Sequence, residues 1–146
     1  RNELYFQSND EVFKISSPDS IVSLELEGKK FVYQTSDPRD MGKKRFLEVA
    51  VDGVATLYIN YYPDILPSNY NKALGTGNVN NILSIKQSYL IRLGDSLILL
   101  DKKGKQFAIA FADKKAEIEA FIKQENISCK ERLDVERVVK YYNSLK

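Results

Sequence analysis

The stretch RFLEVAVDGVATLYINYY, residues 45–62, constrains the fold of this chain more than any other. Apolar residues alternate on both sides of Asp52-Gly53, a pair that favours the positive backbone angles of a two-residue type I′ turn. The turn predicts a β-hairpin in which Val51 lies opposite Val54. Both faces of this hairpin are mainly apolar, so we expect it in the middle of a sheet.

Further strands are predicted before and after this hairpin. Short alternating runs of apolar and polar residues indicate them, and Gly94-Asp95 predicts another two-residue turn. The predicted strands are Ile21–Leu26, Phe31–Thr35, Leu83–Leu93, Ser96–Leu100 and Gln106–Phe111, with Val12–Ile15 as an alternative first strand. Ser17 to Ser20 reads as a turn, and residues 37–44 read as a loop.

The end of the chain changes to helical periodicity. Asp113 is expected to cap one helix, Asn126 to end it in a left-handed conformation, and Asp134 to cap a second helix. The apolar stripes of the two helices are Ile118, Phe121 and Ile122, then Val135, Val138, Val139 and Tyr142. The fold class is therefore α+β: an antiparallel curved sheet or barrel-like roll of about six to seven strands followed by two C-terminal helices. Pleckstrin-homology architecture offers a fold-level analogy.

Composition excludes several kinds of chemistry. The chain has 146 residues and 43% hydrophobic content, enough for a single domain with a sizeable core. Histidine is absent, and Cys129 is the only cysteine, so neither an intrachain disulfide nor a cysteine-rich metal site is possible. We interpret Cys129 as a partly buried residue in the connector between the helices. No catalytic residue, metal or cofactor is expected.

Net charge and hydropathy limit the partners. The formal net charge is only +2, which gives no reason to expect a nucleic acid. No apolar run approaches the roughly 20 residues that span a bilayer, so membrane association is expected only through a lost leader or lipid anchor.

A long segment without periodicity, Tyr62–Asn81, is the best functional indication. Loops of this length inside compact domains are uncommon and are either functional or disordered. A short helix is considered around residues 70–74. In this segment, Gly75-Thr76-Gly77 lacks the nucleotide-binding patterns. Tyrosine and asparagine, typical of recognition loops, are concentrated in and beside it. The candidate ligand- or partner-binding residues are Tyr61, Tyr62, Tyr70, Asn69, Asn71 and Asn78.

Alternatives remain open at this point. Tyr58 and Tyr61 could instead pack in the sheet while the asparagine-rich part is merely mobile. Glu48 is placed at a solvated sheet margin, yet Glu48 with Asp52 or Asp64 could form the carboxylate pair of a hydrolase. Lysine-rich turns could converge on one rim and bind a lipid surface; they lie at residues 29–30, 43–45 and 102–105.

The first residues do not read as part of the fold. LYFQS at residues 4–8 resembles the core of the tobacco-etch-virus protease site used to remove purification tags, with Asn2 and Glu3 in reversed order. We interpret residues 1–8 as a tag remnant and residues 9–146 as the single domain. If the remnant is ordered, we expect it to dock as an added strand or in a groove.

Two segments, FLEVAVDGVATLYINYY and the C-terminal FADKKAEIEAFIKQENISCKERLDVERVVKYYNSL, resemble uncharacterised extracytoplasmic proteins of Bacteroidetes. The resemblance implies export, by a signal peptide or lipoprotein leader, to the periplasm or cell surface, and it carries over no catalytic residue. We therefore expect a non-catalytic extracytoplasmic binding or assembly module that uses the Tyr/Asn-rich loop 60–81, with a protein or a small ligand as its partner.

Overall fold

A computed structural model describes residues 4–8, 10–35, 43–101 and 104–146. Within these residues, six antiparallel strands form one open sheet in the order β3-β4-β5-β6-β7-β8, and β1 and β2 form a separate pair. The strands are β1 (Leu4–Ser8), β2 (Glu11–Ile15), β3 (Leu24–Leu26), β4 (Lys29–Thr35), β5 (Lys44–Val51), β6 (Ala55–Leu66), β7 (Ile82–Leu93) and β8 (Ser96–Leu99). The α+β class is confirmed, and the sheet does not close into a barrel. Most of the loop predicted at residues 37–44 lies outside the described residues.

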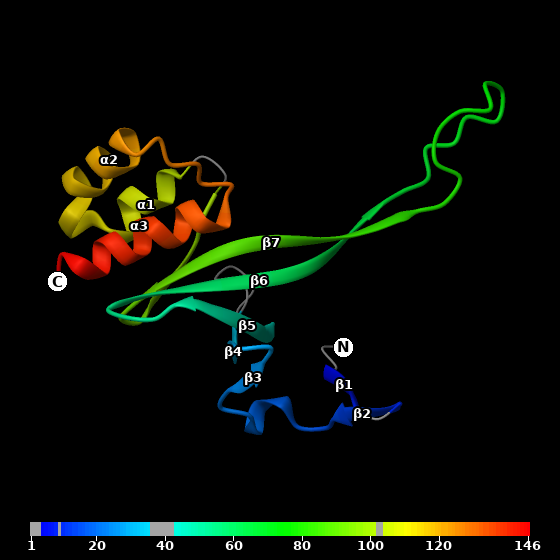
Figure 1. Ribbon diagram of the computed structural model, residues 1–146, viewed down its shortest axis with the longest axis horizontal. Coiled ribbons are helices and arrows are strands. Elements are labelled where there is room, and N and C mark those ends of the chain that lie inside the picture. Colours follow the sequence, from blue (N-terminus) through cyan, green and yellow to red (C-terminus); the bar gives the residue numbers. More distant parts are fainter. Residues whose placement is uncertain (1–3, 9, 36–42, 102–103) are drawn as a thin grey trace.

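Three helices gather on one face of the sheet (Figure 1). They are α1 (Lys105–Ala110), α2 (Lys115–Gln124) and α3 (Arg132–Ser144); short 3-10 turns occupy Pro18–Ser20 and Ala112–Lys114. The main core lies between the three helices and the sheet. Its most buried side chains include Leu57, Ile59, Ile91, Phe107, Phe111, Ile118, Val135, Val138, Val139 and Tyr142. The apolar stripes predicted for the two long helices therefore face this core.

The central hairpin β5–β6 lies mid-sheet as expected, but its turn differs from the prediction. Glu48 pairs with Ile59 and Val49 with Tyr58, and a β-bulge shifts the register before Val51. The predicted two-residue type I′ turn is therefore wrong. Up to Val49 the register differs by two residues, an even number, so these side chains keep their predicted faces. Beyond the bulge Val51 lies on the opposite face from the one predicted and packs in the core with Leu57.

A contact with α3 accounts for this local geometry. The backbone N–H of Ala55 donates to Asn143 Oδ1 at 2.8 Å, and Asn143 Nδ2 donates to the Ala55 carbonyl at 2.9 Å. A Cβ on Gly53 would lie 2.5 Å from Asn143 Nδ2. Position 53 therefore has no room for a side chain. The Asn143 amide occupies that space and satisfies the Ala55 backbone groups, as a neighbouring strand would.

The strand predicted at Gln106–Phe111 is wrong, since α1 occupies this segment. Phe107, Ala110 and Phe111 are buried, whereas Ile109 is exposed. The buried residues are thus three and four positions apart, a spacing that is helical rather than alternating. The stretch FAIAF at residues 107–111 is compatible with both the two-residue period of a strand and the helical period. Packing against β8 and α2 selects the helix.

The predicted helix caps are partly wrong. Asp113 caps no helix; its carboxylate instead accepts a hydrogen bond from Tyr142 Oη at 3.1 Å. Asp134 lies inside the first turn of α3, which begins two residues earlier, and accepts the Ser128 N–H at 2.8 Å. Asn126 has φ +50° just after α2, so the left-handed stop is confirmed.

The N-terminal part of the sheet is less regular than expected. The predicted strand Ile21–Leu26 is reduced to the three residues of β3, and Val22 is almost fully exposed. β1, the segment interpreted as a tag remnant, pairs with β2 as an added strand. The side chain of Tyr5 lines a groove of about 460 Å³ against Leu24, Phe31 and Tyr61.

Candidate interaction site: a projecting β-hairpin and its base

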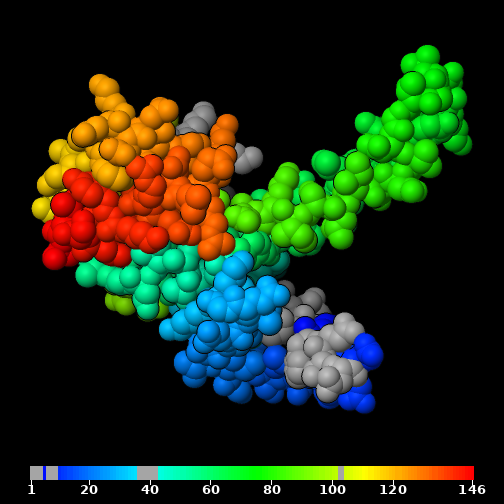
Figure 2. Space-filling view, in the orientation of Figure 1, coloured from blue at the N-terminus to red at the C-terminus, as the bar shows by residue number. Residues whose placement is uncertain are grey.

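The most distinctive feature of the molecule is the arm, which we define as residues 60–88 of the β6–β7 hairpin. β6 and β7 pair over twelve positions, from Ala55 with Leu93 at the body to Leu66 with Ile82 near the tip. Figure 1 shows the arm leaving the sheet, and in Figure 2 it extends away from the body and touches it only at its base. Strand β6 takes Tyr62–Leu66 from the predicted loop, and residues 67–81 are irregular as expected.

Asparagine side chains shape the tip. Asn69 Oδ1 accepts the Asn78 N–H at 2.7 Å, Asn71 Oδ1 accepts the Ala73 N–H at 3.0 Å, and Asn81 Oδ1 accepts the Ser68 N–H at 2.8 Å. These amides satisfy backbone donors that have no strand partner. The short helix considered for residues 70–74 does not form; a turn closed by the Asn71–Thr76 bridge takes its place.

Apolar side chains on the arm are exposed. Ile65, Leu74, Val79, Leu83 and Ile85 are 62–72% exposed. Ile65 lies directly opposite Leu83 and Pro63 opposite Ile85, so four apolar residues share one face of the ribbon. This face continues the side of the sheet that the helices cover in the body, but no helix reaches it. Contiguous exposed apolar surface is typical of interaction sites.

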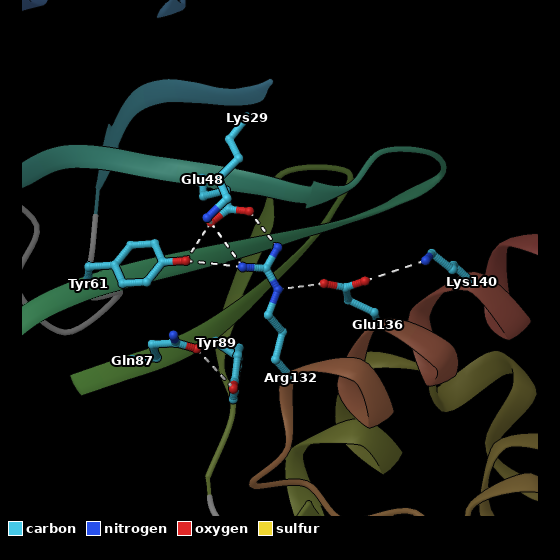
Figure 3. A network of polar contacts seen from close by, with 8 residues as sticks. All are labelled: Lys29, Glu48, Tyr61, Gln87, Tyr89, Arg132, Glu136 and Lys140. Atoms are coloured by element: carbon cyan, nitrogen blue, oxygen red, sulfur yellow. Dashed lines mark hydrogen bonds and ion pairs between the residues drawn. The ribbon is translucent and has the colours of Figure 1, made fainter. Parts of the chain in front are cut away.

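A buried polar network holds the base of the arm (Figure 3). Glu48 is 2% exposed, and its carboxylate accepts hydrogen bonds from Arg132 Nη2 at 2.5 Å and Nη1 at 3.2 Å. Tyr61 Oη donates to Glu48 at 2.5 Å and accepts from Arg132 Nη1 at 3.1 Å. Arg132 also binds Glu136 at 2.8 Å, which in turn contacts Lys140. The placement of Glu48 at a solvated margin is therefore wrong.

The network perturbs the ionisation of its members. Burial would raise the pKa of Glu48, but hydrogen bonds from Arg132 and Tyr61 and the nearby charges hold it below its usual value. Burial, followed by the hydrogen bond to the Glu48 carboxylate, raises the pKa of Tyr61. The hydrogen bond to Glu48 raises the pKa of Arg132. Glu48 is thus held ionised and fully engaged, which suits fastening β5, β6 and α3 together better than proton transfer.

A second groove, of about 610 Å³, lies beside the arm where β8 ends. Ile85, Gln87 and Tyr89 of β7 line it, and Cys129 and Lys130 of the α2–α3 connector form another wall. Cys129 is half-buried, as expected. Burial and the nearby carboxylates of Asp101 and Asp134 raise the pKa of its thiol, the opposite of what an activated nucleophile needs.

The six candidate residues divide between the base and the tip. Tyr61 belongs to the buried network, and Tyr62 lines the groove beside β8. Tyr70 is exposed at the tip, where Asn69, Asn71 and Asn78 organise the backbone. Sequence reasoning missed the apolar pairs of the arm, because they become neighbours only when β6 and β7 pair.

The carboxylates and lysines considered in the alternatives have separate surroundings. Glu48 binds Arg132, whereas Asp52 accepts the Gly53 N–H in the exposed turn and Asp64 pairs with Lys86 at 2.5 Å on the arm. Lys29 opens β4 near one edge of the sheet, and Lys105 opens α1 after the strand at the other edge. Lys102 and Lys103 lie outside the described residues.

Comparisons with known proteins give no relative: no family model, curated protein or solved structure matches the chain. Across the residues that the structure describes, none of the helices is long and apolar enough to cross a membrane. The described part of the chain also holds no cluster of three or more acidic or cysteine side chains suited to a metal ion. The fold and the site therefore define an α+β protein with an open antiparallel sheet and a projecting hairpin.

Proposed function

We propose that this protein is a non-catalytic, extracytoplasmic binding or assembly module whose β6–β7 arm makes the contact with a protein partner. The observation that carries the proposal is the exposed apolar surface of the arm, formed by Leu74 and Val79 at the tip and by Pro63, Ile65, Leu83 and Ile85 on one face of the ribbon. A two-stranded ribbon that buries little of its own apolar surface has marginal stability in water. Coverage by a partner would stabilise the arm.

The base of the arm supports the same role. Arg132, Glu48 and Tyr61 join α3, β5 and β6 where the arm leaves the body. A contact element fixed at its base loses less conformational entropy when it binds than one that swings freely. Tyr70 and the apolar tip residues Leu74 and Val79 are then presented at a defined position.

Capture of partners from an envelope extract of the source organism tests this proposal. The arm variant is Leu74→Ser with Val79→Ser, and the matched control is Val22→Ser with Val54→Ser, two exposed apolar residues of the body. We expect the arm variant to lower recovery of a specific partner at least about tenfold, a loss of about 1.4 kcal/mol, while the control does not. Equal recovery by both variants would overturn the role of the arm.

A further inference from the structure

One edge of the arm has unpaired backbone groups. β8 pairs with β7 only over Leu90–Leu93, so β7 from Ile82 to Ser88 has β6 on one side and no described strand on the other. The Leu100 N–H donates to the Tyr89 carbonyl at 2.9 Å, so the Tyr89 carbonyl points away from β6. In an antiparallel ladder this direction alternates from residue to residue. Gln87, Ile85 and Leu83 therefore present their N–H and carbonyl groups at the open edge.

Pro63 supports this assignment and distinguishes the two edges of the arm. Pro63 lies opposite Ile85 and has no N–H, which is compatible with the ladder because that position makes no hydrogen bond to β7. The missing N–H faces the outer edge of β6, which is thereby blocked against strand addition. The β7 edge has no proline, and its one charged residue, Lys86, is held by Asp64 at 2.5 Å. β7 is thus the edge open to pairing.

We propose that the chain forms a two-fold dimer in which the open edge of β7 pairs antiparallel with the same edge of a second copy, centred on Ile85. The inference rests on the proposed contact role of the arm and adds a second copy of the chain as the contact of its β7 edge. Pairing Ile85 with itself places Leu83 opposite Gln87 of the second copy, so the outward-facing groups of both strands meet. The two arms then form one four-stranded ribbon.

Charge and shape both suit this register. Lys86 lies opposite Ser84 of the second copy, so no like charges face each other across the new pair. The paired segment of the second copy reaches Gln87, which lines the groove beside β8 together with Tyr89. Leu83 of the second copy, exposed in the isolated chain, enters this groove next to Cys129 and Lys130. Because the axis is two-fold, every such contact occurs twice.

Two proline variants test the dimer in the full chain. Ile85→Pro removes an N–H from the open β7 edge, whereas the control Ile65→Pro removes an outward N–H from the blocked β6 edge; neither position bonds the other strand of the arm. Sedimentation equilibrium should find a dimer for the wild type and for Ile65→Pro. We expect Ile85→Pro to raise the dissociation constant at least about tenfold. A monomeric wild type, or equal association of both variants, would overturn the inference.

Disulfide trapping gives a second readout that does not depend on a proline variant folding. Paired Cα atoms at a hydrogen-bonded antiparallel position lie about 5.5 Å apart, within disulfide range. Ile85→Cys should therefore form a covalent dimer under mild oxidation, unlike Leu74→Cys at the tip or the wild type with its Cys129. Failure of Ile85→Cys to cross-link faster than Leu74→Cys would contradict the register.

The two proposals can fail separately. A monomeric wild type whose partner capture still depends on Leu74 and Val79 refutes the dimer and retains the contact role of the arm. If Ile85→Pro also abolishes that capture in a monomeric chain, the edge binds a strand of another protein, which likewise refutes self-pairing. The third outcome is a dimer that Ile85→Pro disrupts, together with partner capture that the Leu74→Ser, Val79→Ser variant does not lower. It retains the dimer and refutes the capture of another protein by the tip.

Discussion

Replacing Arg132 with methionine should cost this protein far more stability than replacing any exposed arginine. The change keeps most of the aliphatic stem but removes both hydrogen bonds to Glu48, at 2.5 and 3.2 Å. Glu48 is 2% exposed, so removing the guanidinium leaves a carboxylate that has little contact with solvent. Removing one partner of a buried ion pair typically costs about 3–5 kcal/mol. Because Tyr61 and, at 3.9 Å, Lys29 remain beside Glu48, we expect about 3 kcal/mol.

Arg137 is the matched control on the same helix. It pairs with Glu125 at 2.6 Å, but both side chains are more than a third exposed. Arg137→Met should therefore cost about 0–1 kcal/mol. Urea denaturation at pH 7, followed by circular dichroism, measures both losses. Equal costs for the two variants would refute the claim that burial of Glu48 controls the energetics.

The pH dependence gives a further check. In the wild type, the lowered pKa of Glu48 means that its contribution to stability is present above the usual value of 4.5 and is lost as pH falls through the lowered pKa. In Arg132→Met, burial raises the pKa of Glu48 instead, so protonation relieves the cost. The stability gap between wild type and variant should narrow as pH falls from 7 toward about 4. A constant gap would show that the loss is not electrostatic.

Three other perturbations have definite expected outcomes. Asn143→Ala removes both hydrogen bonds to the Ala55 backbone and should cost about 1–3 kcal/mol in urea denaturation; a loss below about 0.5 kcal/mol would contradict the clamp. A Cβ on Gly77 would lie 2.5 Å from the Asn69 carbonyl oxygen, whereas a Cβ on Gly75 would face open space. Gly77→Ala should therefore speed amide hydrogen exchange at the tip more than Gly75→Ala does. Equal exchange rates in the two variants would argue against this contact. The thiol of Cys129 should react with a disulfide reagent more slowly in the folded chain than in urea, and a faster folded reaction would indicate activation.

Local sequence patterns predicted much of the architecture. The Gly94-Asp95 turn forms as expected, with Leu93 opposite Ser96 and φ +56° at Gly94. Asn126 ends α2 in a left-handed conformation. These features depend on backbone preferences of one or two residues, so no distant part of the chain is needed to specify them.

The candidate site was only partly visible in the sequence. The tyrosine- and asparagine-rich segment identifies the right region, but its asparagines organise the tip: Asn69 Oδ1 accepts the Asn78 N–H. The apolar face of the arm was missed, because Ile65 and Leu83 are far apart in sequence and meet only across the ribbon. Glu48 was misplaced for the same reason, since Arg132 is 84 residues away.

The sequence by itself determined the α+β class, the central hairpin and its two apolar faces, and the helical end of the chain. These follow from the spacing of apolar residues, which depends only on the geometry of strands and helices. Tertiary structure alone decided that Lys105–Ala110 is helical, that Glu48 is a buried anchor and that residues 60–88 form an arm. Each of those outcomes depends on which distant surface a segment meets, and burial and pairing energies there outweigh local preference.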